Sequence, residues 1–268
     1  MKVMKIMKFI TILLIVAMLV CGCASADIIA ASWEVNDATE PFWSFPLSQE
    51  IMADPDGFLV LANTEHLLSS TFKPDDLVNI AVRKTSSTAI QMRRPVSQAL
   101  SAMFEAALAD GLKLYAASGF RSYQTQKTQY AMRLERVGYD DNMVQKPGAS
   151  DHQTGLGIDV VNYSMIGQRF SQSFINTKEG QWLADHCYEY GFIIRYLKGK
   201  KDVTGINYEP WHLRYVGEEA ARYINDNSLT LEEFWDEWEA YQSGEWIGTH
   251  NDDDTDIIID DGALIIEN

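Results

Sequence analysis

Cysteine is nearly absent from this sequence, with three cysteines in 268 residues. Two of them lie in the apolar N-terminus, so Cys187 is the only one well inside the chain. A lone internal cysteine excludes an internal disulfide framework, and the fold must be stabilised by its hydrophobic core, with or without a metal ion. No second signature of a nucleophilic site accompanies Cys187, so we expect it to be a small buried apolar residue.

Positive charge is also scarce. The chain has 22 lysines and arginines against 38 aspartates and glutamates, which gives a net charge of −16 and a pI of about 4.6. This balance excludes nucleic-acid binding through a broad basic surface, and it excludes electrostatic adhesion to an anionic membrane. Hydrophobic residues make up 46% of the chain, which is enough for one globular domain with appendages.

Long hydrophobic runs are absent except at the N-terminus, where three lysines precede an apolar run over 9–20. This run is too short for a comfortable membrane span, so residues 1–26 are expected to be a signal peptide. Cleavage after the small residues Ala24–Ala26 would release the protein, whereas an imperfect lipobox would leave Cys23 lipidated. Either outcome places the protein outside the cytoplasm, as a secreted protein or as a lipoprotein anchored at the cell wall. The membrane would then be reached only through that lipid anchor.

Hydrophobic periodicity predicts a mixed, non-alternating order of helices and strands, and hence a single α+β domain over 57–243 with a small, mostly antiparallel sheet flanked by helices. Residues 27–56 are expected to be a linker or an N-terminal clasp, and 244–268 an acidic tail, either solvated or forming a β-ribbon. Strands are expected at "GFLVLAN", "KLYAASG", "GIDVVN" and "FIIRY", and helices at "RRPVSQALSAMFEAALAD", "SYQTQKTQYAMRLERVG", "GQWLADHCYEYGF", "EEAARYINDN" and "TLEEFWDEWEAYQSG".

Histidine is limited to five residues, and two of them have a carboxylate at a suggestive spacing. The stretch "SDHQTGLGIDV" holds His152 and Asp159, and "EPWH" holds Glu209 and His212. Two imidazoles and one carboxylate satisfy a catalytic zinc ion, which uses three protein ligands and keeps one open position. Glu209 would remain free to act as a general base in amide hydrolysis, on a segment that Pro210 and Trp211 hold extended.

Each pair of residues taken alone is more often a set of packed or surface residues than a zinc site, because short motifs match freely. A third stretch, "SGFRSYQTQ", sets Arg121 at the end of an expected strand. A guanidinium there could stabilise a developing oxyanion or hold a substrate carboxylate, and the alternative is a surface ion pair.

In this order, "SGFRSYQTQ", "SDHQTGLGIDV" and "YEPWHLRYVG" resemble the zinc D-alanyl-D-alanine carboxypeptidases of the VanY type and their relatives, the L,D-carboxypeptidases and the VanX-type dipeptidases. The resemblance spans roughly residues 57–227. It implies a hedgehog/DD-peptidase-like zinc fold and one zinc ion per chain. It also implies that peptidoglycan stem peptides are the partners of a monomeric enzyme.

The resemblance assigns roles to individual residues. His152, Asp159 and His212 match the zinc ligands, Glu209 matches the catalytic base, and Arg121 matches the arginine that assists the transition state or holds the substrate. The pocket-lining positions of the family fall on Ser150 and Gln126. The family prefers alanine where Gly157 stands, a mild change. No ligand position falls on His66, His186 or His250, and Asp151 is either a partner behind the ligands or simply exposed.

The expected activity is removal of the C-terminal D-alanine from peptidoglycan stem peptides by a zinc metallo-carboxypeptidase. One alternative is an L,D-carboxypeptidase acting on tetrapeptide stems, and another is a dipeptidase acting on free D-Ala-D-Ala, which export disfavours. A non-catalytic cell-wall binding module belongs to a different class, and the carboxylate of Glu209 argues against it, since a binder needs no base. A lysostaphin-like endopeptidase is disfavoured because the chain has no His-x-His pair.

Overall fold

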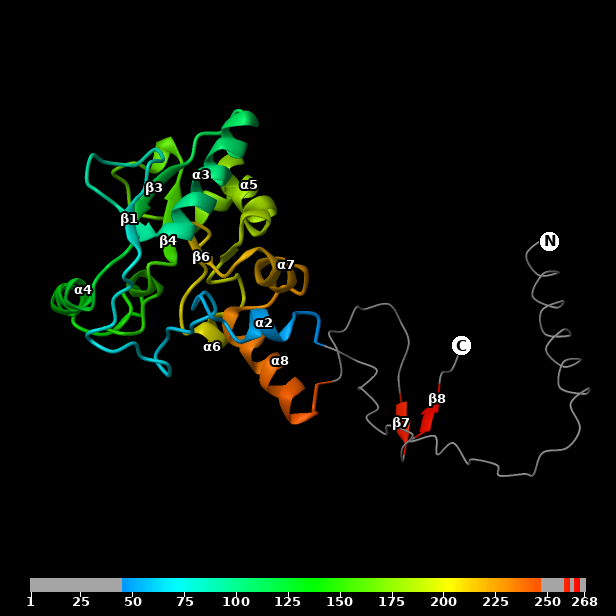
Figure 1. Ribbon diagram of the computed structural model, residues 1–268. Helices are drawn as coiled ribbons and strands as arrows, with labels where there is room; N and C mark the ends of the chain where they lie inside the picture. Colours follow the sequence, from blue (N-terminus) through cyan, green and yellow to red (C-terminus); the bar gives the residue numbers. More distant parts are fainter. Residues whose placement is uncertain (1–44, 247–257, 261–262, 266–268) are drawn as a thin grey trace, which may run out of the picture. The chain divides into compact units, whose positions relative to one another are not determined.

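The computed structural model describes residues 45–246, 258–260 and 263–265 (Figure 1). The expected signal peptide over 1–26, the first part of the 27–56 segment and most of the 244–268 tail lie outside the described residues. Within that tail, β7 (Ile258–Asp260) pairs antiparallel with β8 (Ala263–Ile265). Among the helices of the described ranges, none combines the length and the apolar character that a membrane crossing requires.

A four-stranded sheet in the order β3-β4-β6-β5 lies at the centre of the domain, and all three of its strand pairings are antiparallel. Its strands are β3 (Tyr115–Ser118), β4 (Gly157–Val161), β5 (Phe192–Ile194) and β6 (His212–Tyr215). A separate ribbon pairs β1 (Leu77–Asn79) with β2 (Gln91–Arg93). The predicted α+β class with a small antiparallel sheet is confirmed.

Helix α3 (Arg94–Ala109) packs on the main hydrophobic core with the five residues that its sequence period predicts, which are Val96, Leu100, Met103, Phe104 and Ala107. Pro95 stands in its first turn, where a missing N–H has no intrahelical partner to lose. The same core takes in residues of β3, β4 and β6, of α5 (Lys178–His186) and of the 3-10 turn η4 (Cys187–Tyr190). One face of the sheet is thereby held rigidly, and rigid strands can fix the positions of functional side chains.

A second core joins the two ends of the domain. Helices α7 (Glu218–Asp226) and α8 (Leu231–Ser243) pack on each other and on Phe45, Leu47 and α2 (Gln49–Met52). Phe45 has its ring within 5.0 to 5.5 Å of the rings of four aromatic residues, which are Tyr223, Trp238, Tyr241 and Trp246. The described residues that precede position 57 therefore clasp the domain.

The strand expected at 57–63 does not form, and that prediction is wrong. Side chains satisfy this backbone in place of a neighbouring strand: the Arg214 guanidinium donates to the carbonyls of Phe58 and Val60, and the Trp235 indole donates to that of Leu59. Asp54 accepts from two backbone N–H groups of the same stretch. The sequence shows the apolar run, but it does not reveal such distant partners.

Helix α4 (Tyr123–Val137) lies apart from α3 and α5 (Figure 1). Ser122 caps its N-terminus and Gly138, at φ 87°, ends it in the left-handed conformation. The helix predicted here therefore forms, and it is largely exposed, because its only buried residue is Gln126. The remaining short elements are η1 (Asp151–Thr154), η2 (Tyr163–Met165), η3 (Gln172–Asn176) and α6 (Lys201–Thr204).

Candidate metal centre

The strand register places two of the expected ligands side by side. Asp159 on β4 is directly opposite His212 on β6, although 52 residues separate them in the chain. Ser118 at the end of β3 is the partner of Asp159 on its other side. Directly opposite residues of an antiparallel pair have side chains within contact distance. The sheet itself therefore brings the carboxylate and the imidazole together.

His152 reaches the same point from η1, the turn before β4. Gly155 at φ 68° closes that turn and sends the chain into the strand. The Nδ1 atom of His152 is 2.8 Å from the carbonyl oxygen of Gly119, which fixes its proton there and leaves the lone pair of Nε2 free to bind a metal ion. A side chain at Gly119 would collide with Gln91 and Met92, so only glycine brings that carbonyl close enough.

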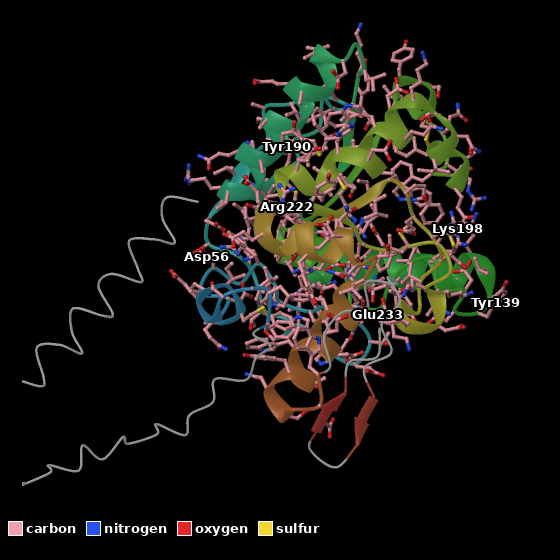
Figure 2. All side chains as sticks on the ribbon, turned by 90° about the vertical axis from the view of Figure 1, so that its right-hand side faces the viewer. Asp56, Tyr139, Tyr190, Lys198, Arg222 and Glu233 are labelled. Atoms are coloured by element: carbon pink, nitrogen blue, oxygen red, sulfur yellow. The ribbon has the colours of Figure 1, made fainter. Side chains whose placement is uncertain are left out.

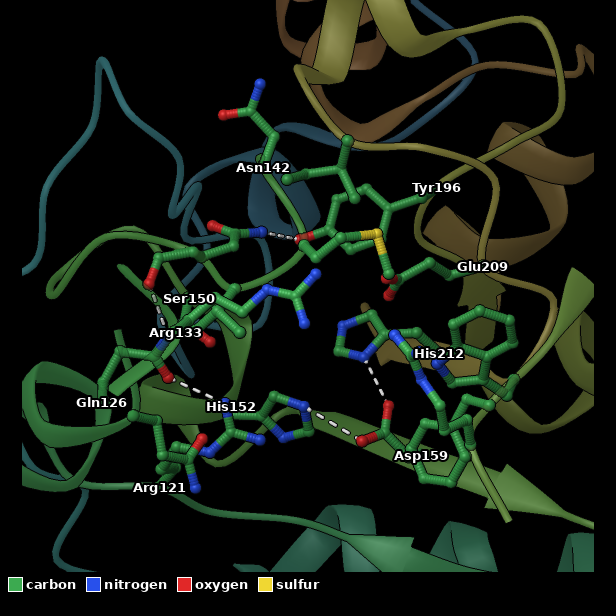
Figure 3. Close-up of a pocket in the computed structure, with 18 of the residues that line it drawn as sticks. Arg121, Gln126, Arg133, Asn142, Ser150, His152, Asp159, Tyr196, Glu209 and His212 are labelled. Carbon is green, nitrogen blue, oxygen red and sulfur yellow. Dashed lines mark hydrogen bonds and ion pairs between the residues drawn. The ribbon is translucent and has the colours of Figure 1, made fainter. Parts of the chain in front are cut away.

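The spacing of the three side chains fits one metal ion. The Nε2 atom of His152 lies 3.4 Å from Oδ2 of Asp159, and Nδ1 of His212 lies 2.9 Å from Oδ1 (Figure 3). Two ligands on one tetrahedral zinc ion are roughly 3.3 Å apart, since each bond is about 2.0–2.1 Å long. Among the described residues, only this group of histidines, cysteines and carboxylates converges well enough to hold an ion.

The donor set and the burial agree with zinc. All three side chains are buried, and two neutral nitrogens with one carboxylate oxygen form a common zinc environment. The Nε2 atom of His212 is buried and has no hydrogen-bond partner within the described part of the chain. Because Nδ1 is the nitrogen close to Asp159, this unpartnered Nε2 is not the atom whose spacing fits the shared ion.

The local charges keep two of the three ligands, His152 and Asp159, in binding form. Burial lowers the pKa of His152, and the nearby Arg121 charge lowers it further, which favours the neutral imidazole. Burial would raise the pKa of Asp159, but the two histidines lower it well below its ordinary range. Burial opposes the charge of His212, but its hydrogen bond to Asp159 raises its pKa. A carboxylate and a neutral His152 are the protonation states that a divalent cation needs.

Glu209 stands beside the ligands on a turn. Its carbonyl accepts a hydrogen bond of 3.0 Å from the backbone N–H of His212, so the segment with Pro210 and Trp211 is a tight turn and the expectation of an extended segment is wrong. Proline is favoured inside such turns. Burial raises the pKa of Glu209 to about 7, and the Asp159 charge adds to the rise while His212 and Arg121 oppose it. A carboxylate with a pKa near neutrality is suited to general acid–base catalysis.

Arg121 faces the same pocket in a fixed conformation. Its Nη1 donates to Oε1 of Gln126 at 2.8 Å, and its Nη2 is 3.2 Å from the hydroxyl oxygen of Ser118. Its backbone N–H donates to the carbonyl of His152 at 2.9 Å, which ties the arginine to the ligand turn. Burial lowers the pKa of Arg121, while the charges of Asp159 and Glu209 favour its cation. Among the described residues, no carboxylate forms the ion pair with Arg121 that was considered from the sequence.

All seven sequence-predicted residues line one pocket of about 390 Å³ (Figure 3). Ser150 is buried in its wall. Gln126 also lines it, but its amide is already committed, because Nε2 donates to the backbone carbonyl of Gln145 while Oε1 accepts from Arg121. Gln126 therefore holds Arg121 and the 142–145 loop in place, and it has little capacity left for a ligand.

Sequence reasoning missed several residues of this pocket. The ring of Tyr196 stacks on that of His212 at 5.2 Å, and its hydroxyl bonds to Asp151 and to the side chain of Gln145. Trp211 forms another part of the wall. A tyrosine in "FIIRY" carries no motif, so only the pairing of β5 with β6 reveals its place.

The surroundings of the other residues named from the sequence indicate structural roles. Asp151 is buried and ion-paired with Arg195 and Arg214, so the exposed alternative is wrong. His66 is exposed, and the exposed ring of His186 pairs with a neighbouring glutamate. Cys187 is buried with a pKa raised to about 12 by desolvation, as expected for an inert apolar residue. His250 lies outside the described residues.

Comparison with known proteins identifies relatives of this chain. Residues 89–218 match the family model of VanY, described as D-alanyl-D-alanine carboxypeptidase. This range contains all seven expected site residues. A protein of Bacillus subtilis (strain 168) named putative carboxypeptidase YodJ is 42% identical over 194 residues, which cover 70% of each chain.

Two solved structures give the same indication. The LdcB LD-carboxypeptidase is 42% identical with a TM-score of 0.63, and the match covers 66% of this chain and 84% of that one. A variant of the vancomycin-resistance D,D-pentapeptidase VanY, solved in complex with Zn(II), is 30% identical with a TM-score of 0.55. That match covers 66% of this chain and 98% of the other.

Proposed function

Because this chain belongs to the VanY family of D-alanyl-D-alanine carboxypeptidases, it is a zinc-dependent carboxypeptidase, and we propose that it removes the C-terminal D-alanine from peptidoglycan stem peptides at the pocket around His152, Asp159 and His212. The observation that carries the proposal is the register of β4 and β6. This register pairs Asp159 with His212 and leaves Glu209 three residues away in the same pocket.

His152, Asp159 and His212 would hold the zinc ion. When bound, zinc would supply Lewis-acid polarisation of the scissile carbonyl and would lower the pKa of a water beside it. The chain contributes the neutral form of His152, which burial and the Arg121 charge favour, with its proton held on Nδ1 by the Gly119 carbonyl, and it contributes the ionised form of Asp159. The buried position of all three side chains excludes bulk solvent and strengthens each charge interaction in the pocket.

Glu209 takes a proton from the attacking water and passes it to the leaving amine of D-alanine. The pKa of about 7 suits both steps, because the group gains and loses a proton readily near neutral pH. The tight turn through Pro210 fixes its distance from His212, so the base is positioned before substrate arrives.

Arg121 stabilises negative charge that develops on the scissile carbonyl oxygen, or holds the terminal carboxylate of the substrate. Its guanidinium is positioned by Gln126 and Ser118, so no reorganisation is needed when charge appears. The pocket volume of about 390 Å³ accommodates a peptide end, but not a folded protein.

A second candidate is hydrolysis of tetrapeptide stems as an L,D-carboxypeptidase. It is favoured by the 42% identity to the LdcB LD-carboxypeptidase, which exceeds the 30% identity to the VanY D,D-pentapeptidase. The two activities share the metal centre and differ in the configuration of the residue before the scissile bond. They are distinguished by the substrate.

We propose that the protein acts outside the cytoplasm, secreted or lipid-anchored, because the N-terminal pattern at 1–26 is that of a signal peptide and the proposed substrate is a cell-wall component. We also propose that it acts as a monomer, because one chain supplies every group of the pocket.

The test is release of free D-alanine from synthetic pentapeptide and tetrapeptide stems, with untreated, chelator-treated and zinc-restored protein. We expect cleavage of the pentapeptide, loss of cleavage with chelator and recovery with zinc. Preferential cleavage of the tetrapeptide would establish the L,D alternative. If both peptides were bound but neither was cleaved in the presence of zinc, the protein would be a binding module and the proposal would be wrong.

A further inference from the structure

The two histidines of the metal centre are held in different ways. The ring nitrogen of a histidine ligand that faces away from the ion normally donates to a carboxylate, a carbonyl or a water, and this bond fixes the orientation of the ring. His152 follows this rule, since its Nδ1 lies 2.8 Å from the carbonyl oxygen of Gly119. The outer nitrogen of His212, Nε2, is buried, and no protein group in the described ranges bonds to it. Another contact must therefore define the plane of this ring.

The hydrogen bond between His212 and Asp159 does not define that plane once a metal is bound. It joins Nδ1 of His212 to Oδ1 of Asp159 at 2.9 Å, and it needs a proton between the two atoms. Metal binding at Nδ1 displaces this proton. Rotation of an imidazole about its Cβ–Cγ bond is soft, with broad minima. A fixed ring in the metal-bound protein therefore needs a contact on its face.

Tyr196 makes this contact. The centroid of its ring lies 5.2 Å from that of His212, and the two ring planes differ by 18° (Figure 3). Both side chains are buried. The ring of His152 meets that of His212 edge-on, at 4.9 Å and 68°. Aromatic pairs in these arrangements are stabilised beyond the area that they bury. The imidazole of His212 is thus confined by one nearly parallel ring and by one nearly perpendicular ring.

Tyr196 is itself firmly held. Its hydroxyl donates to Oδ2 of Asp151 at 3.2 Å and accepts from the side-chain amide of Gln145. The guanidinium carbon of Arg195 lies 5.0 Å from the centroid of its ring, a cation–π distance. Asp151 is ion-paired with the same arginine, and it directly precedes His152. The ring that contacts one histidine ligand is therefore anchored on the residue next to the other.

We propose that Tyr196 is a positioning residue, whose ring fixes the plane of the His212 imidazole so that Nδ1 faces the metal position. The inference rests on the zinc site of the proposed function and deepens it by naming the residue that orients one ligand. The aromatic face takes the place of the hydrogen-bonding partner that usually stands behind a histidine ligand. Tyr196 acts through His212, and it needs neither to bind the metal nor to transfer a proton.

The experiment compares the wild type with three variants. Tyr196→Phe keeps the aromatic face and removes the hydroxyl, whereas Tyr196→Leu removes the ring and keeps an apolar side chain. Tyr190→Leu is the matched control, because Tyr190 also stacks on an aromatic ring, that of Trp182 at 6.3 Å and 29°, but does not line the pocket. It belongs to η4, which packs against α3 (Figure 2).

Two measurements use the metal alone. Competition with a chromophoric chelator gives the zinc dissociation constant of the metal-free protein, and the visible absorption spectrum of the cobalt(II)-loaded protein reports the coordination geometry. Tyr196→Leu should raise the dissociation constant by about tenfold or more, and should alter the cobalt spectrum even when cobalt is saturating. Tyr196→Phe should stay within about threefold of the wild type and keep its spectrum, because the ring face is retained. Tyr190→Leu should keep both properties.

Wild-type zinc affinity and an unchanged cobalt spectrum in Tyr196→Leu would overturn the inference. Equal losses in Tyr196→Phe and Tyr196→Leu would also overturn it, since the hydroxyl and not the ring would then matter, and so would an equal loss in Tyr190→Leu. If circular dichroism shows that Tyr196→Leu does not fold, Tyr196→Met replaces it, because an unbranched side chain fills the space without a ring. The proposed function fails separately, if the zinc-loaded wild type releases no D-alanine.

Discussion

Glu209 is the single residue on which the proposed chemistry depends most. It combines a position three residues before His212 with a pKa raised to about 7 by burial. Neither property belongs to a glutamate on an ordinary surface turn. The motif "EPWH" predicts the residue, whereas its protonation behaviour follows only from the surroundings that the fold builds.

Replacing Glu209 with glutamine should remove turnover without removing the metal. The amide keeps the size of the side chain but cannot accept the proton, so kcat should fall by about 10²- to 10⁴-fold. Metal analysis should still find one zinc ion per chain, because the three ligands are intact. Glu105→Gln, an exposed change on α3, is the control and should retain activity. If Glu209→Gln turned over at the wild-type rate, Glu209 would not be the base.

The same residue should make the metal-free protein less stable as pH rises. The folded state keeps a proton on Glu209 up to about pH 7, whereas the unfolded chain releases it near 4.5. The folded state therefore binds more protons in this window, and the free energy of unfolding falls as pH increases from 4.5 to 7. Glu209→Gln removes this loss, since it cannot ionise.

Urea unfolding of the chelator-treated wild type and Glu209→Gln at pH 4 and pH 8 checks this. Each pKa unit of difference corresponds to roughly 1.4 kcal/mol, so the variant should gain about 1–3 kcal/mol relative to the wild type between the two pH values. An equal difference between the two proteins at both pH values would show that the Glu209 carboxyl is not perturbed by burial.

Elements with a strong period were predictable. The five core residues of α3, the strands β3, β4 and β5, and the helices α7 and α8 all follow from spacing and end signals in the sequence. One expected element does not form. The 57–63 run lacks a strand because distant side chains bind its carbonyls, whereas α4 forms over the expected residues.

The candidate site was likewise predictable only in part from the sequence. The identities of His152, Asp159, Glu209 and His212 stand out in the sequence, because few residue types bind zinc or transfer protons. Their convergence depends on the register of β4 with β6, which no local pattern specifies. The stacking of Tyr196 on His212 likewise requires the sheet order.

Helix α8 offers a test of local stability. Thr230 and Glu233 form a capping box at its start, with reciprocal bonds of 3.1 and 2.8 Å between side chains and backbone. Thr230→Ala should lower the free energy of unfolding by about 1 kcal/mol, since the part-buried N–H of Glu233 in the first turn loses its partner. Gln242→Ala on the exposed face of the same helix is the control and should change stability little. Equal effects of the two changes would contradict the capping role.

Across the whole molecule, a buried ionic network connects the metal site to the ends of the domain. Asp151, next to His152, is paired with Arg195 and Arg214, and both Nη atoms of Arg195 donate to Glu232 on α8 at 2.6 Å. Two acids and two bases balance the charge inside the protein. The network joins the ligand turn, the sheet and the C-terminal helix, which lies beyond the matched family range.

Breaking this network should weaken both the fold and the metal site. Glu232→Gln leaves the fully buried Arg195 with one ionised partner, and losing a buried pair typically costs about 3–5 kcal/mol. Zinc affinity should also fall, because Asp151 steadies the turn that carries His152. Urea unfolding and zinc titration measure the two effects, with Glu239→Gln, exposed on the same helix, as control. Unchanged stability in Glu232→Gln would show that the network does not tie the domain together.

The central claim is that His152, Asp159 and His212 together bind one zinc ion that the peptidase activity requires. The most direct measurement is zinc titration of the metal-free protein while D-alanine release from a pentapeptide stem is followed, for the wild type and for His212→Ala. The account predicts that activity rises linearly and reaches its maximum at one zinc ion per chain, and that His212→Ala stays inactive at this ratio. Full activity of the metal-free protein, or of His212→Ala at one equivalent of zinc, would contradict it.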